Sequence, residues 1–384
     1  MSDLAESTPR KFDSRFVDGI RGFSSLAVAL YHTMLFIGVT GTAAASLPIV
    51  FWLARNGYQG VPIFIVLSGF VLMIAVSMAG LGKLPQGFRH FIWRRFRRIV
   101  PPYWAALALS LALITAIPLL QSRSDTKWDG QLFVDWQSVA SHIFLVHDLN
   151  PSWTNKINGP MWSVSVEWQI YFLMPLLILP LWRWLGKWVA VPLVFALSLA
   201  PHFIGVQQKH HHLRFLPQYL GNLDRLHPWF IGLFAVGMLA ADLLTNSKVR
   251  ARFFWVPFAI ILSGIFAFAH LAEANAWLSE SLLGIATAML VMWLAGRPRA
   301  LVHRLLTSRP SLGLGKMSYS LYLVHMPFLA IGNLVLMQND LPVALHATLM
   351  YALVLPLAIA LAFGFHWGIE RHFMTSHQQE LKIR

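Results

Sequence analysis

Long runs of apolar residues are the feature that most constrains how this chain can fold. Ten windows, each bounded by charged or turn-forming residues, approach or exceed the ~20 apolar residues that a membrane helix needs. They fall near residues 17–39, 58–80, 99–120, 162–181, 188–205, 227–244, 254–271, 277–295, 316–337 and 343–368. Because the bilayer core admits only helices and closed barrels, and these windows are continuous rather than alternating, we expect an all-α polytopic membrane helix bundle with about ten transmembrane helices.

The composition excludes several other classes of protein. Of the 384 residues, 57% are hydrophobic and only 12% are charged, about half the charged fraction of a soluble domain. A soluble enzyme and a nucleic-acid-binding module are therefore excluded, and we expect the lipid bilayer rather than nucleic acid as partner. The chain has no cysteine, which excludes thiol catalysis, thiolate metal sites and disulfides. No other metal-ligand spacing is present, so we expect no metal site.

The distribution of basic residues predicts the orientation of the bundle. If the N-terminus lies inside, 22 of the 30 Lys and Arg residues lie inside, 7 lie outside, and Arg21 lies within the first helix. This asymmetry follows the positive-inside rule, so both termini are expected to be cytoplasmic. We accordingly divide the chain into a cytoplasmic tail at 1–16, a transmembrane domain at 17–370 and a second cytoplasmic tail at 371–384.

The first window carries two ionisable residues that are costly inside a membrane. Arg21 and His32 are eleven residues apart, so on a helix they project from one face, roughly 16 Å apart along the axis. Such residues need a partner or a function. Arg21 is either a snorkelling arginine neutralised by Asp18 or part of a polar track with His32. His32 is either a hydrogen-bonding group between helices or a functional base.

A carboxyl group in the fourth window is expected at the same depth as His32. Glu167 lies roughly 9 Å below the outer end of its helix, and His32 roughly 10 Å below the outer end of the first helix. A buried Glu beside a buried His is a plausible base with its orienting partner. The alternative is a structural Glu that bonds to a neighbouring helix or to Tyr171 one turn on.

An arginine cluster opens the third predicted helix at the cytoplasmic face. Arg95 and Arg98 are three residues apart and share a helix face. Guanidinium groups suit phosphate binding, although arginines at a helix mouth can equally be topology anchors. In the ninth window, His325 reaches the middle of the membrane, where it either packs between helices or contributes to a site.

With these residues in hand, the chain resembles the acyltransferase 3 family of bacterial integral-membrane O-acyltransferases, which modify surface polysaccharides and related glycans. The resemblance covers essentially the whole chain, and two departures from its patterns, Val164 and Ile170, are small. It rests on five motifs in order: Arg21 with His32; Gly60-Val61 through Ser68-Gly69-Phe70; Arg95, Arg98, Ile99 and Pro101; Asn158-Gly159-Pro160 through Trp162, Ser163, Glu167 and Tyr171; and Ser318 to His325.

The resemblance implies a multi-pass enzyme of the bacterial plasma (inner) membrane that uses acyl-CoA, usually acetyl-CoA, as donor substrate and binds no permanent cofactor. The implied acceptor is a hydroxyl group of a carbohydrate or glycolipid. His32 would act as general base or as acyl carrier, Glu167 would orient it, and Arg21, Arg95 and Arg98 would bind the donor. Further residues implied to line the substrate path are Asp18, Trp162, Ser163, Tyr171 and His325. Some relatives carry an additional periplasmic hydrolase-like domain, and we expect none here.

Two other functions remain open from the sequence. Buried His and Glu residues also suit the proton relay of a glycolipid or polysaccharide transporter or flippase, although no inverted repeat is visible. A purely structural partner of a polysaccharide synthase would tolerate replacement of His32. The long connection at 121–161 is expected outside the membrane, where Trp128, Trp136 and Trp153 either bind a sugar or form an interfacial belt.

Overall fold

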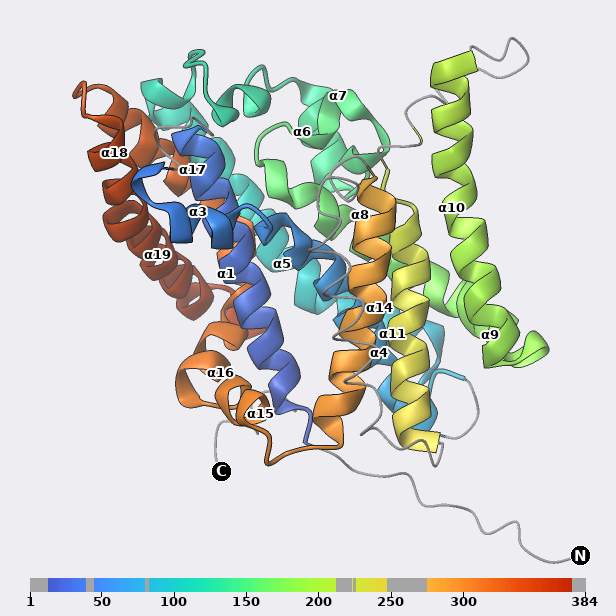
Figure 1. Ribbon diagram of the computed structural model, residues 1–384. Helices are drawn as coiled ribbons and strands as arrows, with labels where there is room; N and C mark the ends of the chain where they lie inside the picture. Colours follow the sequence, from blue (N-terminus) through green and yellow to red (C-terminus); the bar gives the residue numbers. More distant parts are fainter. Residues whose placement is uncertain are drawn as a thin grey trace, which may run out of the picture. The chain divides into compact units, whose positions relative to one another are not determined.

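The computed structural model describes residues 13–38, 45–79, 83–211, 223, 226–246 and 275–374. Within these ranges every regular element is helical (Figure 1). The longer helices are α1 (Arg15–Ile37), α4 (Gly60–Met78), α5 (Gly87–Ala116), α8 (Trp162–Leu173), α10 (Lys187–His211), α11 (Trp229–Asn246), α14 (Ala276–Ala295), α17 (Ser318–Met337) and α19 (Leu355–Gly368). The shorter α-helices are α3 (Pro48–Ala54), α6 (Trp136–Ile143), α7 (Pro151–Thr154), α9 (Leu179–Leu185), α15 (Leu301–Leu306), α16 (Arg309–Lys316) and α18 (Val343–Leu349).

Nine helical stretches among the described residues are long and apolar enough to cross a membrane. Each overlaps one predicted window, while the window at 254–271 lies outside the described residues. The prediction of an all-α, polytopic membrane bundle is therefore confirmed, whereas the side on which each terminus lies stays a prediction. The stretches are Arg15–Ile37, Pro48–Met78, Gly87–Ala116, Gly159–Leu185, Lys187–Gln208, Trp229–Asn246, Ala276–Ala295, Ser318–Met337 and Val343–Gly368.

The third span starts earlier than its apolar window predicts. α5 begins at Gly87, so Arg95 and Arg98 lie inside the helix, and their predicted position at its opening is wrong. Gly87 has φ +77°, a conformation that favours glycine and allows the sharp entry into the helix. The apolar window did not include the first three turns of α5, because these turns are basic and aromatic. A helix can extend through such residues, since its backbone hydrogen bonds do not depend on hydropathy.

The described chain forms two compact units, each assembled from separate segments. Helices α1, α4, α5, α8 and α16 pass from one unit into the other, so their residues are divided between the two. The first unit comprises Met1–Arg21, Pro62–Phe91 and Ile170–Leu312, and the second comprises Gly22–Val61, Ile92–Gln169 and Gly313–Arg384.

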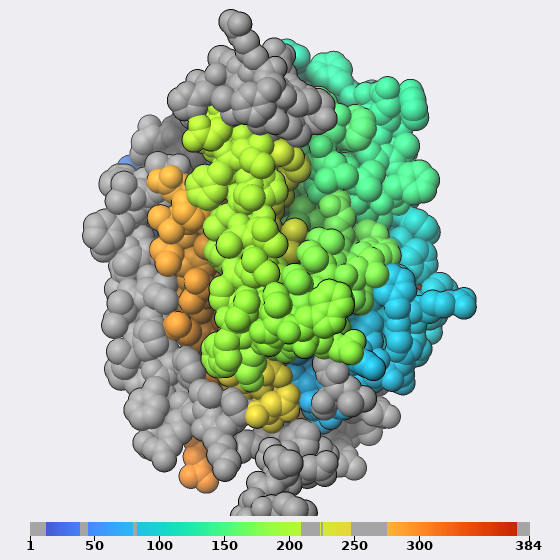
Figure 2. All heavy atoms as spheres, turned by 90° about the vertical axis from the view of Figure 1, so that its right-hand side faces the viewer, coloured from blue at the N-terminus to red at the C-terminus, as the bar shows by residue number. Residues whose placement is uncertain are grey.

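The core of the first unit is α11, which packs against both α10 and α14 (Figure 1). α4 crosses α11 closely at two glycines. A Cβ atom on Gly69 would overlap the carbonyl of Phe234, and one on Gly237 would overlap the carbonyl of Val66. Small residues let membrane helices approach in this way. α9 and α10 lie at the surface of this unit (Figure 2).

A buried carboxylate ties three helices of the first unit together. Asp242 of α11 is 6% exposed, and its Oδ2 accepts a hydrogen bond from Lys187 Nζ at 2.7 Å. Its Oδ1 accepts from Ser77 Oγ at 3.3 Å and from Asn246 Nδ2 at 2.8 Å. Both oxygens are thus occupied, which is the condition under which a buried charge is tolerated.

The first turns of α1 pack on α15 within the first unit. The rings of Phe16 and His303 lie 5.4 Å apart between centroids, and a Cβ on Gly19 would overlap the carbonyl of Leu306. The close approach of these two helices fixes the path of α1 just before Arg21.

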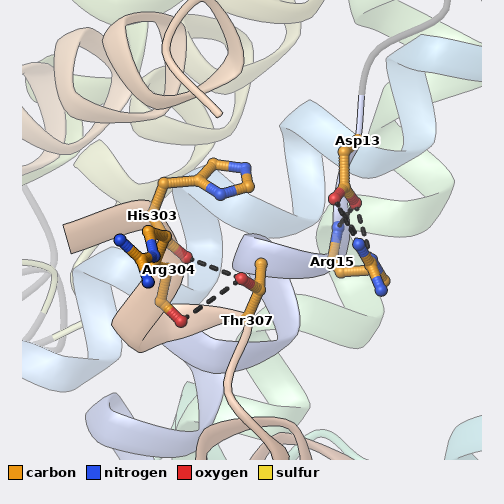
Figure 3. Close-up of polar contacts among 5 residues, drawn as sticks. All are labelled: Asp13, Arg15, His303, Arg304 and Thr307. Carbon is orange, nitrogen blue, oxygen red and sulfur yellow. Dashed lines mark hydrogen bonds and ion pairs between the residues drawn. The ribbon is translucent and has the colours of Figure 1, made fainter. Parts of the chain in front are cut away.

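Figure 3 shows the polar contacts around this packing. Arg15 donates to the Asp13 carboxylate, with Nη2 and Oδ2 2.8 Å apart, at the start of α1. On α15, Thr307 Oγ1 donates to the carbonyls of His303 at 2.9 Å and Arg304 at 3.4 Å, satisfying two terminal carbonyl groups of that helix.

In the second unit, α17 packs against α19 and is anchored at its first turn. Glu370, just beyond α19, accepts hydrogen bonds from the backbone N–H of Ser320 at 3.2 Å and from its hydroxyl at 2.5 Å. His366 Nδ1 lies 2.8 Å from the same carboxylate oxygen. Tyr319 donates its hydroxyl proton to the carbonyl of Ile99 at 3.0 Å, which joins α17 to α5.

The long polar connection between α5 and α8 folds into short helices in this same unit. Three side chains cap them in the usual way: Thr126 accepts from Trp128 N, Asp135 from Ser138 N and Asn150 from Ser152 N. The apolar stretch at 139–146, which is too short to span a membrane and which the sequence suggests as an interfacial helix, overlaps α6.

Candidate active site

Two histidines from opposite ends of the sequence meet in the second unit. His32 of α1 and His325 of α17 form a hydrogen bond in which Nδ1 of His32 and Nε2 of His325 are 3.0 Å apart. Their ring centroids are 5.0 Å apart, with the planes tilted by 38°. His325 is completely buried, whereas His32 is half-buried. The sequence singled out both residues, but it did not predict that they pair.

A proline in α17 explains how His325 is held in place. Pro327 lacks the N–H that would bond to the carbonyl of Leu323 four residues earlier. Asn158 Nδ2 donates to that carbonyl at 2.8 Å and to Ser110 Oγ at 3.0 Å. The part of α17 around Pro327 is therefore tied to α5 and to the turn that precedes α8. Two residues before the proline, His325 Nδ1 lies 2.8 Å from the carbonyl of Leu321.

Polar groups of α8 lie next to this histidine pair. The hydroxyl groups of Ser163 and Tyr322 are 2.5 Å apart, and both residues are buried. Tyr322 packs edge-on to His325, with centroids 6.2 Å apart. Glu167, one turn after Ser163, is close enough to the Tyr322 hydroxyl to interact with it electrostatically. The structure thus places the predicted residues Ser163 and Glu167 near the histidines. Nδ1 of His32 faces His325, so the orientation of His32 by Glu167 stays a prediction.

Arg21, in the first unit, has hydrogen-bond donors that the protein does not use. Its Nη2 makes one long contact, 3.4 Å, to Ser68 Oγ. Its Nε is buried and has no hydrogen-bond partner among the described residues. Asp18 is half-buried and forms no ion pair with Arg21 in the described ranges, so the interpretation that Asp18 neutralises Arg21 is wrong. A guanidinium with open donors suits an oxyanion such as a phosphate group.

The remaining predicted residues are distributed over both units. Arg95 and Arg98 are half-buried on α5 in the second unit, and Trp162 is half-buried at the start of α8. Tyr171 belongs to the first unit, where it is buried and packs edge-on against Phe234 with centroids 6.3 Å apart. Their roles in binding or catalysis stay predictions.

One of the tryptophans considered for sugar binding is a core residue. Trp128 is completely buried, and its Nε1 donates to the carbonyl of Leu120 at 3.1 Å. Its predicted role in sugar binding is therefore wrong. Trp136 is 75% exposed and Trp153 is half-buried. The neighbouring residue Lys127 is exposed and lies within electrostatic range of His32.

A second histidine pair lies in the same connection, and no sequence pattern predicted it. His142 and His147 are completely buried and stacked, with centroids 3.8 Å apart and planes at 14°. His142 Nδ1 is 2.7 Å from the carbonyl of Ser138, and no other ring nitrogen of the pair has a hydrogen-bond partner among the described residues. Burial lowers the pKa of His142 to about 4. Burial and the adjacent His142 lower the pKa of His147 well below its usual value.

Two further residues of the site lie inside the family motifs but were not assigned a role. Tyr322 lies three residues before His325 and so shares its helix face, a signal that the sequence did contain. Asn158 could not have been assigned, because its role depends on a carbonyl group 165 residues away.

Comparison with known proteins decides the family. The family profile described as an acyltransferase domain matches residues 14–367, nearly the whole chain. The chain belongs to this family, acyltransferase 3. The resemblance inferred from the five motifs is thereby confirmed. No solved structure shows a significant match to the chain.

Relatives of this acyltransferase 3 chain are distant in sequence. It is 24% identical over 359 residues to the O-acetyltransferase OatA of Staphylococcus aureus, an alignment that covers 85% of this chain and 52% of OatA. It is 22% identical over 338 residues to YrhL of Bacillus subtilis, provisionally named a peptidoglycan O-acetyltransferase, covering 83% of this chain and 49% of YrhL. It is 25% identical over 332 residues to BcsY of Komagataeibacter xylinus, provisionally named a membrane-bound transacylase. This alignment covers 84% of this chain and 74% of BcsY. The chain thus spans about half the length of OatA and YrhL.

Proposed function

We propose that this acyltransferase 3 protein is a membrane O-acyltransferase. It moves an acyl group, in the first place acetyl, from acyl-CoA to a hydroxyl group of a sugar, polysaccharide or glycolipid. The observation that carries the proposal is the hydrogen-bonded pair of His32 and His325 on two membrane helices, with His32 the more accessible of the two. The family and the printed names of OatA, YrhL and BcsY support the reaction class.

In this proposal His32 is the general base. Its free ring nitrogen takes the proton of the acceptor hydroxyl while the hydroxyl oxygen bonds to the carbonyl carbon of the thioester. When the tetrahedral intermediate collapses, the carbon–sulfur bond breaks and the thiolate takes the proton back from His32. The products are the ester and free coenzyme A, and Glu167 stabilises the transient imidazolium charge. The alternative is that His32 first carries the acyl group itself.

The donor is a substrate, so no permanently bound cofactor is needed. Arg21 presents a buried Nε with no partner among the described residues, which fits a phosphate oxygen of coenzyme A. Arg95 and Arg98 share one face of α5 and are assigned the other phosphate groups. Because Arg21 precedes His32 by three turns of one uninterrupted helix, the extended pantetheine arm would run along α1.

We further propose that transfer is vectorial across the bacterial inner membrane. The basic face of the sequence is the cytoplasmic one, where acyl-CoA is made. His32 and Glu167 lie in the outer half of the bilayer by residue counting, and the polar connection with α6 and α7 would face the acceptor. Sealed inside-out vesicles test this point: acetyl-CoA added outside should acylate a glycan trapped in the lumen. Transfer only to acceptor on the donor's side would contradict it.

Release of coenzyme A by the purified protein tests the reaction itself. Because the chain has no cysteine, a thiol-reactive dye reports free coenzyme A without a background from the protein. With acetyl-CoA and an oligosaccharide acceptor, His32→Ala should lower turnover by about 10²–10⁴-fold, the usual cost of losing a general base. The thermal unfolding temperature in detergent is the control and should stay near that of the wild type.

Three outcomes would contradict the proposal. A folded His32→Ala protein with normal turnover would leave His32 without a catalytic role. A wild-type protein that binds acetyl-CoA but never forms an ester would not be an acyltransferase. Movement of an unmodified glycolipid across vesicles, abolished by His32→Ala, would identify a flippase instead.

A further inference from the structure

The contacts of His325 fix which of its two ring nitrogens carries a proton. Its Nδ1 lies 2.8 Å from the carbonyl oxygen of Leu321, and a carbonyl oxygen can only accept a hydrogen bond. Nδ1 must therefore be the N–H donor. A neutral imidazole has only one N–H group, so Nε2 of neutral His325 has a lone pair and can only accept.

This lone pair in turn determines the state of His32. Nε2 of His325 is 3.0 Å from Nδ1 of His32, so Nδ1 of His32 must supply the proton of that hydrogen bond. The other nitrogen of neutral His32, Nε2, then has no proton and is the basic atom. The direction of the chain is set by one backbone carbonyl: His32 donates to His325, which donates to Leu321.

We propose that His325 is a positioning residue that holds His32 in the tautomer whose Nε2 accepts the proton of the acceptor hydroxyl. The proposal rests on the proposed function and adds to it the atom that acts as base and the residue that selects it. His325 is 0% exposed and acts through His32 rather than on substrate. Without it, His32 would be free to adopt the other tautomer or to rotate, and either change removes the base from its place.

The proposal also predicts how the pair responds to one added proton. The Leu321 carbonyl keeps Nδ1 of His325 protonated, so an added proton leaves His32 with an N–H group at Nε2 and abolishes its action as a base. Only the unprotonated pair is active. Lys127 is a charged group within electrostatic range of His32. The other titratable groups packed around the pair are Tyr31, Tyr322 and, next to Tyr322, Glu167.

Two amide substitutions separate positioning from mere packing. The side-chain oxygen of Gln reaches the place of a histidine Nε2, whereas the amide of Asn reaches only the place of Nδ1. His325→Gln can therefore still accept from His32, and its kcat should stay within about tenfold of the wild-type value. His325→Asn loses the acceptor, and its kcat should fall by about a hundredfold or more with an unchanged KM for acetyl-CoA. A residue that served only packing would give the two variants equal activity.

A matched control and a pH profile complete the kinetic test. His346, half-buried on α18, bonds to Asn333 at 2.8 Å, away from the pair, and His346→Gln should leave kcat unchanged. In the wild type, kcat should fall in acid as the pair takes up its proton. In His325→Gln this acid limb should shift to a different pH, because the neighbouring group can no longer titrate. An acid limb unchanged by the substitution would overturn the proposal.

A spectroscopic measurement tests the tautomer without any turnover. The ¹⁵N chemical shifts of His32, assigned by comparison with His32→Ala, should show protonated Nδ1 and unprotonated Nε2 at neutral pH. His325→Asn should shift His32 toward the other tautomer. A wild-type His32 protonated at Nε2 would overturn the inference even if the enzyme is an acyltransferase. Normal turnover of His32→Ala, in contrast, would contradict the proposed function itself.

Discussion

The second unit contains two histidine pairs whose rings meet in different geometries. His32 and His325 meet nitrogen to nitrogen, with a hydrogen bond of 3.0 Å. His142 and His147 meet face to face, with centroids 3.8 Å apart and no hydrogen bond between the rings. In the first arrangement one ring donates the hydrogen bond and the other accepts it, so the positions of the protons are defined. The second can pass no proton between its rings and has only to remain uncharged.

The difference shows that burial alone does not identify a catalytic histidine. The stacked pair is the more deeply buried of the two, and its pKa values are lowered, yet no nitrogen of it faces a second titratable group in a hydrogen bond. The hydrogen-bonded pair has one buried and one half-buried member, so one ring is anchored and the other can meet a substrate. We therefore assign chemistry to the pair of His32 and His325, and packing to the pair of His142 and His147.

The largest expected effect is a loss of folding stability in acid, which we expect from the stacked pair His142 and His147. The pKa of His142 is about 4 in the folded chain, against about 6.5 when unfolded, and the pKa of His147 is lowered as well. The unfolded chain therefore binds more protons between about pH 6.5 and 4, so stability is full above pH 6.5 and is lost as the pH falls toward 4. The lowered pKa of His142 alone corresponds to a loss on the order of 3 kcal/mol.

Thermal unfolding in detergent at pH 7.5 and pH 4.5 measures this loss. Burial raises the pKa of Asp148, which acts in the opposite direction and makes the net loss smaller. The control is His147→Phe, which removes one of the two titrating rings and should reduce the difference between the two pH values. Equal unfolding temperatures of the wild type at both pH values would show that the stacked rings accept protons freely.

A smaller effect tests whether donor binding, which we assign to Arg21, is separate from the chemistry proposed for His32 and His325. Arg21→Gln should raise the KM or the dissociation constant for acetyl-CoA about tenfold or more, because a charge-assisted contact to phosphate is worth roughly 1.5–3 kcal/mol. The kcat should change little, in contrast to His32→Ala. Arg21→Lys should rescue binding poorly if the guanidinium makes a two-pronged contact. Isothermal titration in detergent measures the dissociation constant for acetyl-CoA. An unchanged affinity in Arg21→Gln would leave Arg21 a structural residue.

The smallest expected effect concerns the stacked pair at neutral pH. His147→Phe keeps an aromatic ring in the stack and removes two buried nitrogens that have no partner among the described residues. Replacing such groups by an apolar ring is nearly neutral or stabilising, so the free energy of unfolding should rise by between zero and about 2 kcal/mol. Turnover should be unchanged. A large loss of turnover in a stable His147→Phe protein would place this pair in the reaction.

The sequence was sufficient for the membrane fold because apolar length is a local property. Nine predicted windows have a counterpart among the described helices, since a span needs only length and hydropathy to be recognised. The start of α5 at Gly87 escaped the same reasoning because its first turns are basic and aromatic.

The candidate site was predictable as a set of residues but not as a geometry. Helix periodicity and the family motifs identified His32, Glu167 and His325, which the structure gathers in one unit. The pairing of His32 with His325, and of Asn158 with a carbonyl released by Pro327, depends on contacts between segments far apart in the chain. Local patterns contain no information on such contacts. The stacking of His142 on His147 was missed for the same reason, because the two rings come from two different short elements, α6 and the 3₁₀ helix His147–Leu149.

The most direct test of the account is a crossed measurement on one residue from each pair. His32→Gln and His147→Gln carry the same chemical change, and each is measured for release of coenzyme A and for thermal unfolding in the same detergent. We predict that His32→Gln loses about 10²-fold or more in turnover and unfolds like the wild type. We predict that His147→Gln unfolds at a lower temperature, because its amide is buried without partners, and keeps its turnover while folded. The opposite pattern, a folded but inactive His147→Gln beside an active His32→Gln, would contradict the assignment of catalysis to the hydrogen-bonded pair.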